Sequence, residues 1–266
     1  MTKPVSGTKE WACHSVNIQT GCENDCRYGY CKAQAIRFGK ATPESWSHPV
    51  INQKAVNQKR RKLDGTVMYP TQHDITPANL LPSIGVLCKM LAAGNKVLIV
   101  SKPHLECVQA MVTQLDQWRG RVLFRFTIGS VDDDVLGFWE PHAPKFGERL
   151  KALRHAYANG FETSVSCEPM LDDHVRDVIE EVRPYVTDAV LIGKPNKLML
   201  RAGMNMGSLP EASETIKRAN ILISTFTDDF VWTLYRQYDD DQMVKWKDSI
   251  KQVIGLPRPT VKGMDK

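Results

Sequence analysis

Residues 21–31 read GCENDCRYGYC and contain Cys22, Cys26 and Cys31, three of the seven cysteines in the chain. Three residues separate the first two thiols and four separate the last two. Because the other four cysteines are scattered, this crowding favours a metal site over disulfides. The loop directly follows the first predicted strand, 14–19, so it can bring the three sulfurs together.

Three cysteine ligands suit a four-iron cluster whose fourth iron stays open to an exogenous ligand, whereas an electron-carrying site normally fills all four positions with cysteine. Two other interpretations stay open. Structural zinc could take His14 or Cys13 as a fourth ligand, although no second pair of ligands with zinc spacing follows. An electron-transfer cluster could recruit Cys167 if folding brings it close.

The composition is that of an ordinary soluble protein, with 266 residues, 42% hydrophobic and 24% charged. This length can bury one large α/β core without disulfides. No run of eighteen apolar residues could span a bilayer, and the first residues lack the apolar core of a secretory signal. We therefore expect a cytoplasmic protein with no membrane contact.

Short β-branched runs alternate with amphipathic stretches, a pattern typical of parallel strands joined by crossover helices. The predicted strands are His14 to Gln19, Thr66 to Pro70, Lys96 to Ser101, Val122 to Ile128, Glu162 to Ser166 and Ala189 to Ile192. The predicted helices are Tyr30 to Phe38, Pro77 to Ala93, His104 to Trp118, Lys145 to Asn159, Asp173 to Val182 and Pro210 to Ala219. Periodicity alone leaves open a doubly wound sheet or a partial barrel.

Two segments fall outside this alternation. Residues 41–64 are polar and hold the basic run Lys59–Lys62, so we expect a surface insertion. Residues 221–266 are expected to form a C-terminal cap on the same domain, with a helix over Lys245 to Ile254. The main α/β domain is thus predicted to span residues 1–220.

The cysteine loop resembles that of the radical SAM superfamily, in the branch similar to spore photoproduct lyase and related DNA-repair lyases, where an aromatic residue precedes the last cysteine. Tyr30-Cys31 matches that pair. The usual superfamily loop places two residues between the second and third cysteines, whereas this chain has four. Similar segments follow in the same order over residues 12–196, most closely between Thr127 and Leu171.

The resemblance implies a partial (β/α)6 TIM-like barrel with a short C-terminal helical extension. It implies an enzyme that holds a [4Fe-4S] cluster through the three cysteines. Such an enzyme reductively cleaves S-adenosylmethionine (SAM) to a 5′-deoxyadenosyl radical, which takes hydrogen from a substrate. Cluster and SAM should lie at the carboxyl ends of the strands, where βα proteins build their sites.

Polar residues at the strand ends are therefore candidates for binding SAM. Lys102 matches a family lysine expected to meet the SAM carboxylate, although a solvated loop lysine is an equal alternative. Thr127 and Ser130 could bond the ribose or the methionyl group, or could serve the turn. Tyr30 could pack on adenine. Glu168 could bond SAM or substrate, or form a salt bridge.

Thr71, His73 and Asp74 end the second predicted strand, where many family members carry a glycine-rich motif that is absent here. We assign the three residues to the site in general, with a buried hydrogen-bonded pair as the alternative. Asn196 ends the sixth strand and could contact cofactor or substrate. Cys167 could donate a hydrogen atom to a product radical, although burial as a small apolar side chain is the stronger expectation.

The expected partners follow from the same resemblance. The cluster needs an external one-electron reductant of the flavodoxin or ferredoxin type. The basic run Lys59–Lys62 and the net charge of +5 permit a nucleic acid or nucleotide substrate, although a solvated insertion would also explain the run. We expect a monomer.

Overall fold

The computed structural model describes residues 4–5 and 7–263. Within these residues, seven strands form one sheet in the order β1-β4-β5-β6-β7-β8-β9, and every neighbouring pair is parallel. The strands are β1 (His14–Ser15), β4 (Thr66–Tyr69), β5 (Lys96–Ser101), β6 (Val122–Thr127), β7 (Glu162–Cys167), β8 (Val190–Ile192) and β9 (Val244–Trp246). The register places Val97 of β5 between Val67 of β4 and Val122 of β6.

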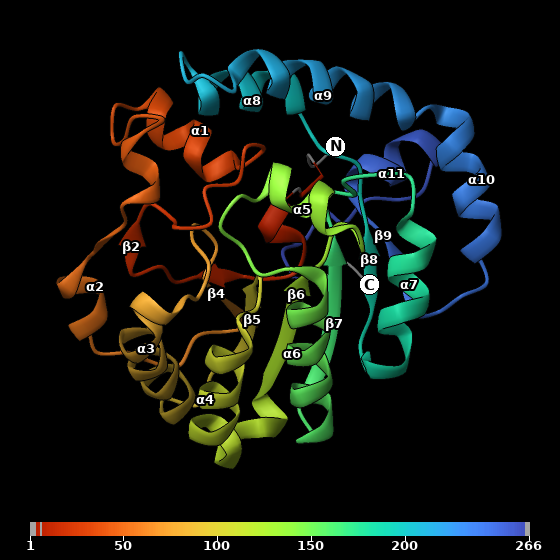
Figure 1. Ribbon diagram of the computed structural model, residues 1–266. Coiled ribbons are helices and arrows are strands. Elements are labelled where there is room, and N and C mark those ends of the chain that lie inside the picture. The colour runs from red at the N-terminus through yellow and green to blue at the C-terminus, as the bar shows by residue number, and fades with distance from the viewer. Residues whose placement is uncertain (1–3, 6, 264–266) are drawn as a thin grey trace.

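The strand order decides between the two architectures that periodicity leaves open. In a doubly wound sheet the order reverses once, whereas here the main-sheet strands succeed one another in chain order from one edge to the other. Each crossover therefore adds a strand on the same side, and α3, α4, α6 and α7 cover the outer face (Figure 1). The prediction of a partial TIM-like barrel is confirmed.

The helices occupy most of the predicted positions. They are α1 (Tyr30–Arg37), α2 (Gln53–Asn57), α3 (Leu80–Ala92), α4 (Leu105–Leu115), α5 (Asp133–Trp139), α6 (Phe146–Ala158), α7 (Val175–Val182), α8 (Leu198–Met206), α9 (Ala212–Thr225), α10 (Asp228–Tyr238) and α11 (Asp248–Ile254). Asp132 caps α5 by accepting from the backbone N–H of Asp134, and Thr227 caps α10 in the same way. The sequence pattern does not predict α2, α5, α8 or α10.

The C-terminal segment differs from the expected helical cap. The predicted helix over Lys245 to Ile254 is wrong at its start, because Val244–Trp246 forms β9 and pairs with β8, and α11 begins only at Asp248. Residue 220, the predicted end of the main domain, lies inside α9. Residues 221–266 thus supply a strand of the main sheet as well as helices.

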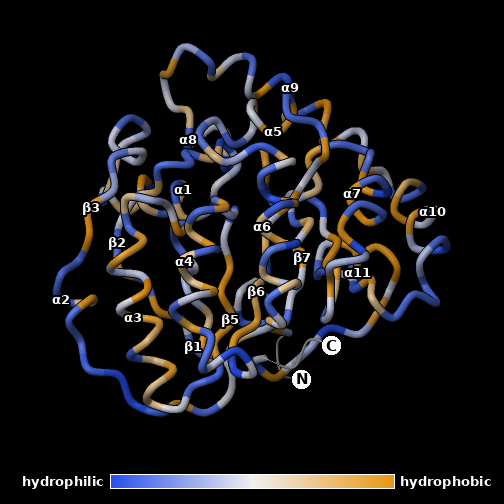
Figure 2. The backbone as a smooth tube through the Cα atoms, turned by 60° about the horizontal axis from the view of Figure 1, so that its bottom comes forward, coloured by the Kyte–Doolittle hydropathy of each residue, from blue (hydrophilic) through white to orange (hydrophobic). Residues whose placement is uncertain are grey.

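The insertion between α1 and β4 carries its own small sheet. Strand β3 (Val50–Ile51) pairs antiparallel with β2 (Gln19–Thr20), directly before the cysteine loop. Figure 2 shows the hydrophilic chain around α2 at the edge of the molecule. Gly21 joins this sheet to the cysteine loop with φ +92°, and a Cβ there would lie 2.7 Å from the Trp46 carbonyl oxygen. The start of the loop therefore requires glycine.

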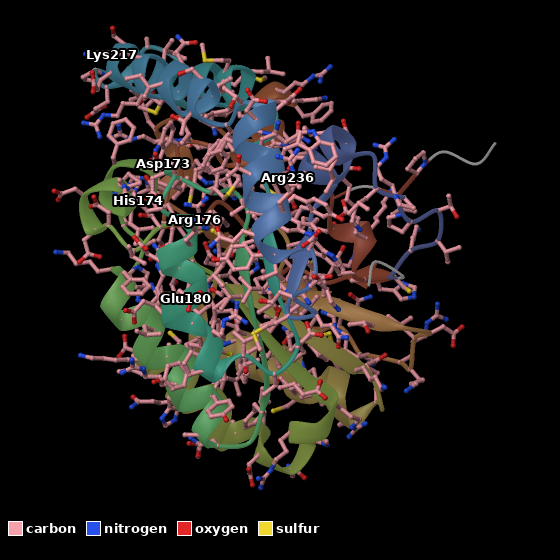
Figure 3. All side chains as sticks on the ribbon, turned by 90° about the vertical axis from the view of Figure 1, so that its right-hand side faces the viewer. Asp173, His174, Arg176, Glu180, Lys217 and Arg236 are labelled. Atoms are coloured by element: carbon pink, nitrogen blue, oxygen red, sulfur yellow. The ribbon has the colours of Figure 1, made fainter. Side chains whose placement is uncertain are left out.

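Apolar side chains fill the space between the sheet and its outer helices. Phe124, Phe126 and Phe161 are fully buried there, and the Phe124 ring contacts the Phe126 ring in a tilted arrangement at 5.5 Å and the Phe161 ring edge-to-face at 5.3 Å between centroids. Charged side chains such as Arg176 and Glu180 of α7 lie on the outer surface (Figure 3). Within the described residues, no helix combines the length and the apolar composition that crossing a bilayer requires.

Candidate active site

A cavity of about 770 Å³ lies at the carboxyl ends of the parallel strands. Its wall includes the residues that directly follow β4, β5 and β7, because parallel strands all present their carboxyl ends at one edge. Eleven of the thirteen predicted site residues line it: Cys22, Cys26, Tyr30, Cys31, Thr71, His73, Asp74, Lys102, Thr127, Glu168 and Asn196.

The three thiols of the cysteine loop all face this cavity. Cys22 and Cys26 are buried and Cys31 is half-buried. The Cys22 sulfur accepts from the backbone N–H of Asp74 at 3.4 Å, and the Cys31 thiol donates to the Thr71 carbonyl at 3.4 Å. Burial raises the pKa of Cys26 and of Cys31 to about 12, and it also holds the pKa of Cys22 well above its ordinary value.

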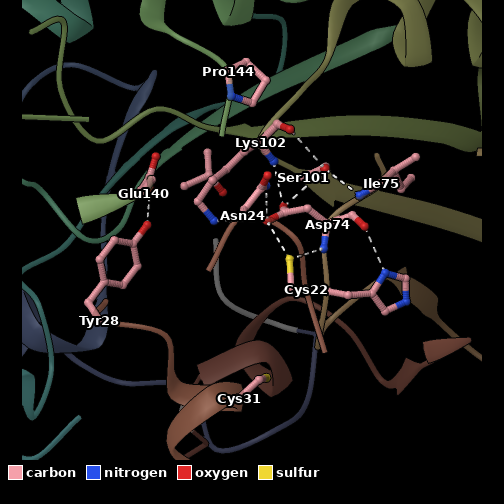
Figure 4. A network of polar contacts seen from close by, with 12 residues as sticks. Cys22, Asn24, Tyr28, Cys31, Asp74, Ile75, Ser101, Lys102, Glu140 and Pro144 are labelled. Carbon is pink, nitrogen blue, oxygen red and sulfur yellow. Dashed lines mark hydrogen bonds and ion pairs between the residues drawn. The ribbon is translucent and has the colours of Figure 1, made fainter. Parts of the chain in front are cut away.

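The thiols approach the cavity from separate places on its wall, as Figure 4 shows for Cys22 and Cys31. Among the described residues, no three His, Cys, Asp or Glu side chains converge on a point where one metal ion could sit. Cluster thiolates bind separate irons, so they do not need to converge on a single ion. The donor set and its spread around one cavity therefore fit an iron-sulfur cluster.

Asp74 is the centre of a buried polar network beside Cys22 (Figure 4). Its carboxylate accepts from the Lys102 backbone N–H at 2.8 Å, from the Asn24 amide at 2.9 Å and from the Lys102 ammonium at 3.3 Å. Burial alone would raise the pKa of Asp74, but the charge of Lys102 and these hydrogen bonds outweigh it and hold the pKa at about 2. The Lys102 ammonium is therefore already paired with a carboxylate of the protein itself.

Thr71 and His73 hold the neighbouring backbone. The Thr71 carbonyl accepts from the Tyr30 hydroxyl at 2.7 Å as well as from Cys31, so one peptide group positions the aromatic-cysteine pair. Asn17 accepts from the Thr71 N–H at 2.7 Å. His73 accepts from the Ile18 N–H through Nε2 at 3.3 Å, and burial lowers its pKa.

Tyr28 lies in the unusually long gap between Cys26 and Cys31, and sequence reasoning assigns it no role. Its hydroxyl donates a hydrogen bond to Glu140, and the Lys102 ammonium lies 5.9 Å from the centroid of its ring. Glu140 in turn pairs with the fully buried Arg149 at 2.5 Å. The additional loop residues are thus accommodated by directing Tyr28 inward against a buried ion pair.

The sequence did not predict a role for another buried lysine, Lys247. Lys247 directly follows β9 and is fully buried, with its ammonium 3.0 Å from Glu10 and 3.0 Å from Glu168. The same ammonium lies 3.1 Å from the centroid of the Trp11 ring. Glu168, which the sequence assigns to SAM, substrate or a salt bridge, makes the salt bridge and also lines the cavity.

Ser130 and Cys167 are the two predicted residues that do not line the cavity. Ser130 is buried, donates to Asp172 and accepts from the Asp132 N–H at 2.9 Å, so its hydroxyl stabilises the turn before α5. Cys167 is fully buried in the apolar core, while its neighbour Ser166 faces the cavity because side chains alternate along a strand. This placement favours the apolar interpretation of Cys167.

The basic run Lys59–Lys62 lies away from the cavity. The Lys62 ammonium donates to the Gly94 carbonyl, and the Leu63 N–H donates to the Asn95 side chain at 2.8 Å. Gly94 and Asn95 directly precede β5, so the run packs at the amino-terminal end of the strands. The wall of the cavity contains none of its residues.

No family model matches the chain. An uncharacterized protein, ORF301 of Acidianus two-tailed virus, is 26% identical over 213 residues, covering 74% of this chain and 69% of that protein. A cysteine-to-alanine variant of spore photoproduct lyase superposes with a TM-score of 0.54 at 16% identity, covering 84% of this chain and 77% of that one.

A tyrosine-to-phenylalanine variant of the same enzyme gives a TM-score of 0.54 at 16% identity and covers 85% of this chain and 77% of that one. The predicted resemblance is thus confirmed for the fold: the chain has the architecture of spore photoproduct lyase, a radical SAM enzyme.

Proposed function

We propose that this protein is a radical SAM enzyme that holds a [4Fe-4S] cluster through Cys22, Cys26 and Cys31. The observation that carries the proposal is the placement of the three thiols. They face one cavity whose other walls are the polar ends of parallel strands. The fold of spore photoproduct lyase supports it independently. When bound and reduced by an external one-electron donor, the cluster supplies the electron that splits SAM into methionine and a 5′-deoxyadenosyl radical.

The chain's own residues position the groups that surround the cavity. Thr71 fixes Tyr30 and Cys31 through one carbonyl, and Asp74 holds the strand end next to Cys22. Thr127, Glu168 and Asn196 line the same cavity and would offer polar groups to SAM or substrate. Because Thr127 ends β6 and Glu168 directly follows β7, the sheet fixes the backbone of both residues before a ligand enters.

We propose a nucleic acid or a nucleotide as the substrate class. Support comes from the fold, since two similar spore photoproduct lyase structures hold a dinucleoside spore photoproduct at TM-scores of 0.51. Phosphate contacts weaken as salt rises, so oligonucleotide binding should fall steeply between 50 and 200 mM salt. Affinity that does not depend on salt would argue for a different substrate.

An anaerobic cleavage assay tests the central proposal. The protein is reconstituted with iron and sulfide, reduced with dithionite and given SAM, and 5′-deoxyadenosine is measured. We expect product from the wild type and only background from Cys26→Ala. Cys88→Ala is the matched control, because Cys88 lies on α3 outside the cavity wall and should keep full product. Wild-type product no higher than that of Cys26→Ala would leave a non-catalytic iron-sulfur or zinc protein as the explanation.

A further inference from the structure

We propose that Arg201 and Lys194 form the oxyanion subsite of the cavity and bind a carboxylate or a phosphate of its ligand. The inference deepens the proposed function and rests on it, because it names the residues that recognise the ligand's negative charge. It also changes the assignment made from the sequence, which gives this task to Lys102.

Arg201 stands on the first turns of α8 and lines the cavity while only half-buried. Its guanidinium carbon lies 5.8 Å from the centroid of the Tyr30 ring. Within residues 4–5 and 7–263, no hydrogen bond or ion pair engages its side chain. Glu168, whose negative charge acts on it, already pairs with Lys247 at 3.0 Å. Arg201 thus presents a positioned donor group without an acceptor.

Lys194 lies on the connection between β8 and α8, shortly before Arg201, and it too lines the cavity while half-buried. Ser249 holds its backbone from both sides, accepting from the Lys194 N–H at 2.9 Å and donating to its carbonyl at 3.3 Å. The ammonium makes no hydrogen bond or ion pair with the residues that the structure describes. The backbone at Lys194 is therefore fixed while its charge remains available to a ligand.

The buried cations in the wall, Lys102 and Lys32, and the buried Lys247 behind Glu168 are already neutralised. Lys102 pairs with Asp74, Lys247 with Glu10 and Glu168, and Lys32 with Asp25 at 2.6 Å. Breaking such a pair to bind a ligand would leave a buried carboxylate unpaired, which is costly. Arg201 carries no such cost, and its planar fork matches the two oxygens of a carboxylate or phosphate.

Two pairs of probes separate the possible sources of the oxyanion. SAM and its decarboxylated analogue differ in the carboxylate, and a thymidine dinucleotide and its methylphosphonate analogue differ in the phosphate charge. Calorimetric titration measures Kd before and after iron and sulfide are supplied. Losing a charged hydrogen bond should raise Kd for one charged probe about 10- to 100-fold in Arg201→Gln, and less in Lys194→Gln. The partner of that probe, which lacks the anionic group, should bind to Arg201→Gln as tightly as to the wild type.

Arg176→Gln removes one positive charge from the outer surface of α7 and should change no Kd (Figure 3). Arg201→Lys keeps the charge without the fork and should fall between the wild type and Arg201→Gln. A loss confined to SAM identifies the carboxylate, and a loss confined to the dinucleotide identifies the phosphate. Equal losses within both pairs, no loss at all, or no binding of either charged probe by the wild type would overturn the subsite.

The oxyanion subsite and the proposed SAM cleavage can be rejected independently of each other. Arg201-dependent binding without any 5′-deoxyadenosine would keep the subsite and reject SAM cleavage. Normal 5′-deoxyadenosine formation, together with ligand binding that does not depend on Arg201, would keep SAM cleavage and reject the subsite. Thermal unfolding of each variant checks that the fold is intact.

Discussion

Lys102 and Lys247 occupy equivalent places, because each directly follows a strand of the main sheet, β5 and β9, and each is buried. They differ in their partners. Lys102 pairs with one carboxylate, Asp74, which keeps other donors, whereas Lys247 is shared by Glu10 and Glu168. The comparison shows that one strand-end lysine can belong to a local network while another joins the distant ends of the chain.

The largest effect should come from Lys247→Met. This change leaves the buried Glu10 without a cation, and breaking a buried pair in this way costs about 3–5 kcal/mol of unfolding free energy. Denaturant titration of the apoprotein measures it. The double variant Glu10→Gln with Lys247→Met removes the stranded charge and should recover much of the loss. If the double variant is as unstable as the single, packing rather than charge explains the lysine.

Lys102→Met should cost less, about 1–3 kcal/mol. Asp74 would keep the Asn24 amide and the backbone N–H of residue 102 as donors, so its charge would remain partly satisfied. The same titration gives the value. A loss larger than that of Lys247→Met would contradict the proposed difference between the two lysines.

The stability of Lys247→Met should depend on pH differently from that of the wild type. Burial raises the pKa of Glu10 above its ordinary value in spite of Lys247. Without Lys247 this pKa should rise further, so the folded variant would take up a proton that the unfolded chain does not. The destabilisation by Lys247→Met should therefore shrink as pH falls toward 4.5, by about 1.4 kcal/mol per pH unit at most. A destabilisation that grows on acidification would contradict this linkage.

Cys167→Ala should have the smallest effect, a loss of about 1 kcal/mol from the core beside the strand end that carries Glu168. Its placement away from the cavity wall predicts unchanged SAM consumption and unchanged product yield once a substrate is identified. A large fall in product yield with normal SAM cleavage would instead support Cys167 as a hydrogen-atom donor.

The sequence predicts most accurately the elements and residues that depend on short-range sequence pattern. The predicted bounds of β5 match those observed, and α1, α4 and α6 differ from their predicted bounds by a few residues, because each carries a clear period and a stop signal. The cysteine loop and the strand-end residues Asp74 and Lys102 are likewise short-range features. They meet at one cavity because parallel strands end at one edge.

Features that depend on distant contacts were missed. Strand β9 has three residues, too few for a period, and its pattern merges with that of the helix that follows. Glu10 and Lys247 are 237 residues apart, so no spacing relates them. The role of Tyr28 depends on Glu140, which stands after α5, a helix that the pattern analysis did not detect.

The wall of the cavity next to Lys247 combines residues from near both ends of the chain. The Val5 N–H donates to the Pro259 carbonyl at 2.7 Å, and the Gly263 N–H donates to the Lys9 carbonyl at 2.9 Å. A purification tag inserted next to Lys9 or Lys262, which both line the cavity, would therefore obstruct ligand entry. A tag inserted within residues 58–62 would stand at the far end of the barrel and leave the cavity unobstructed.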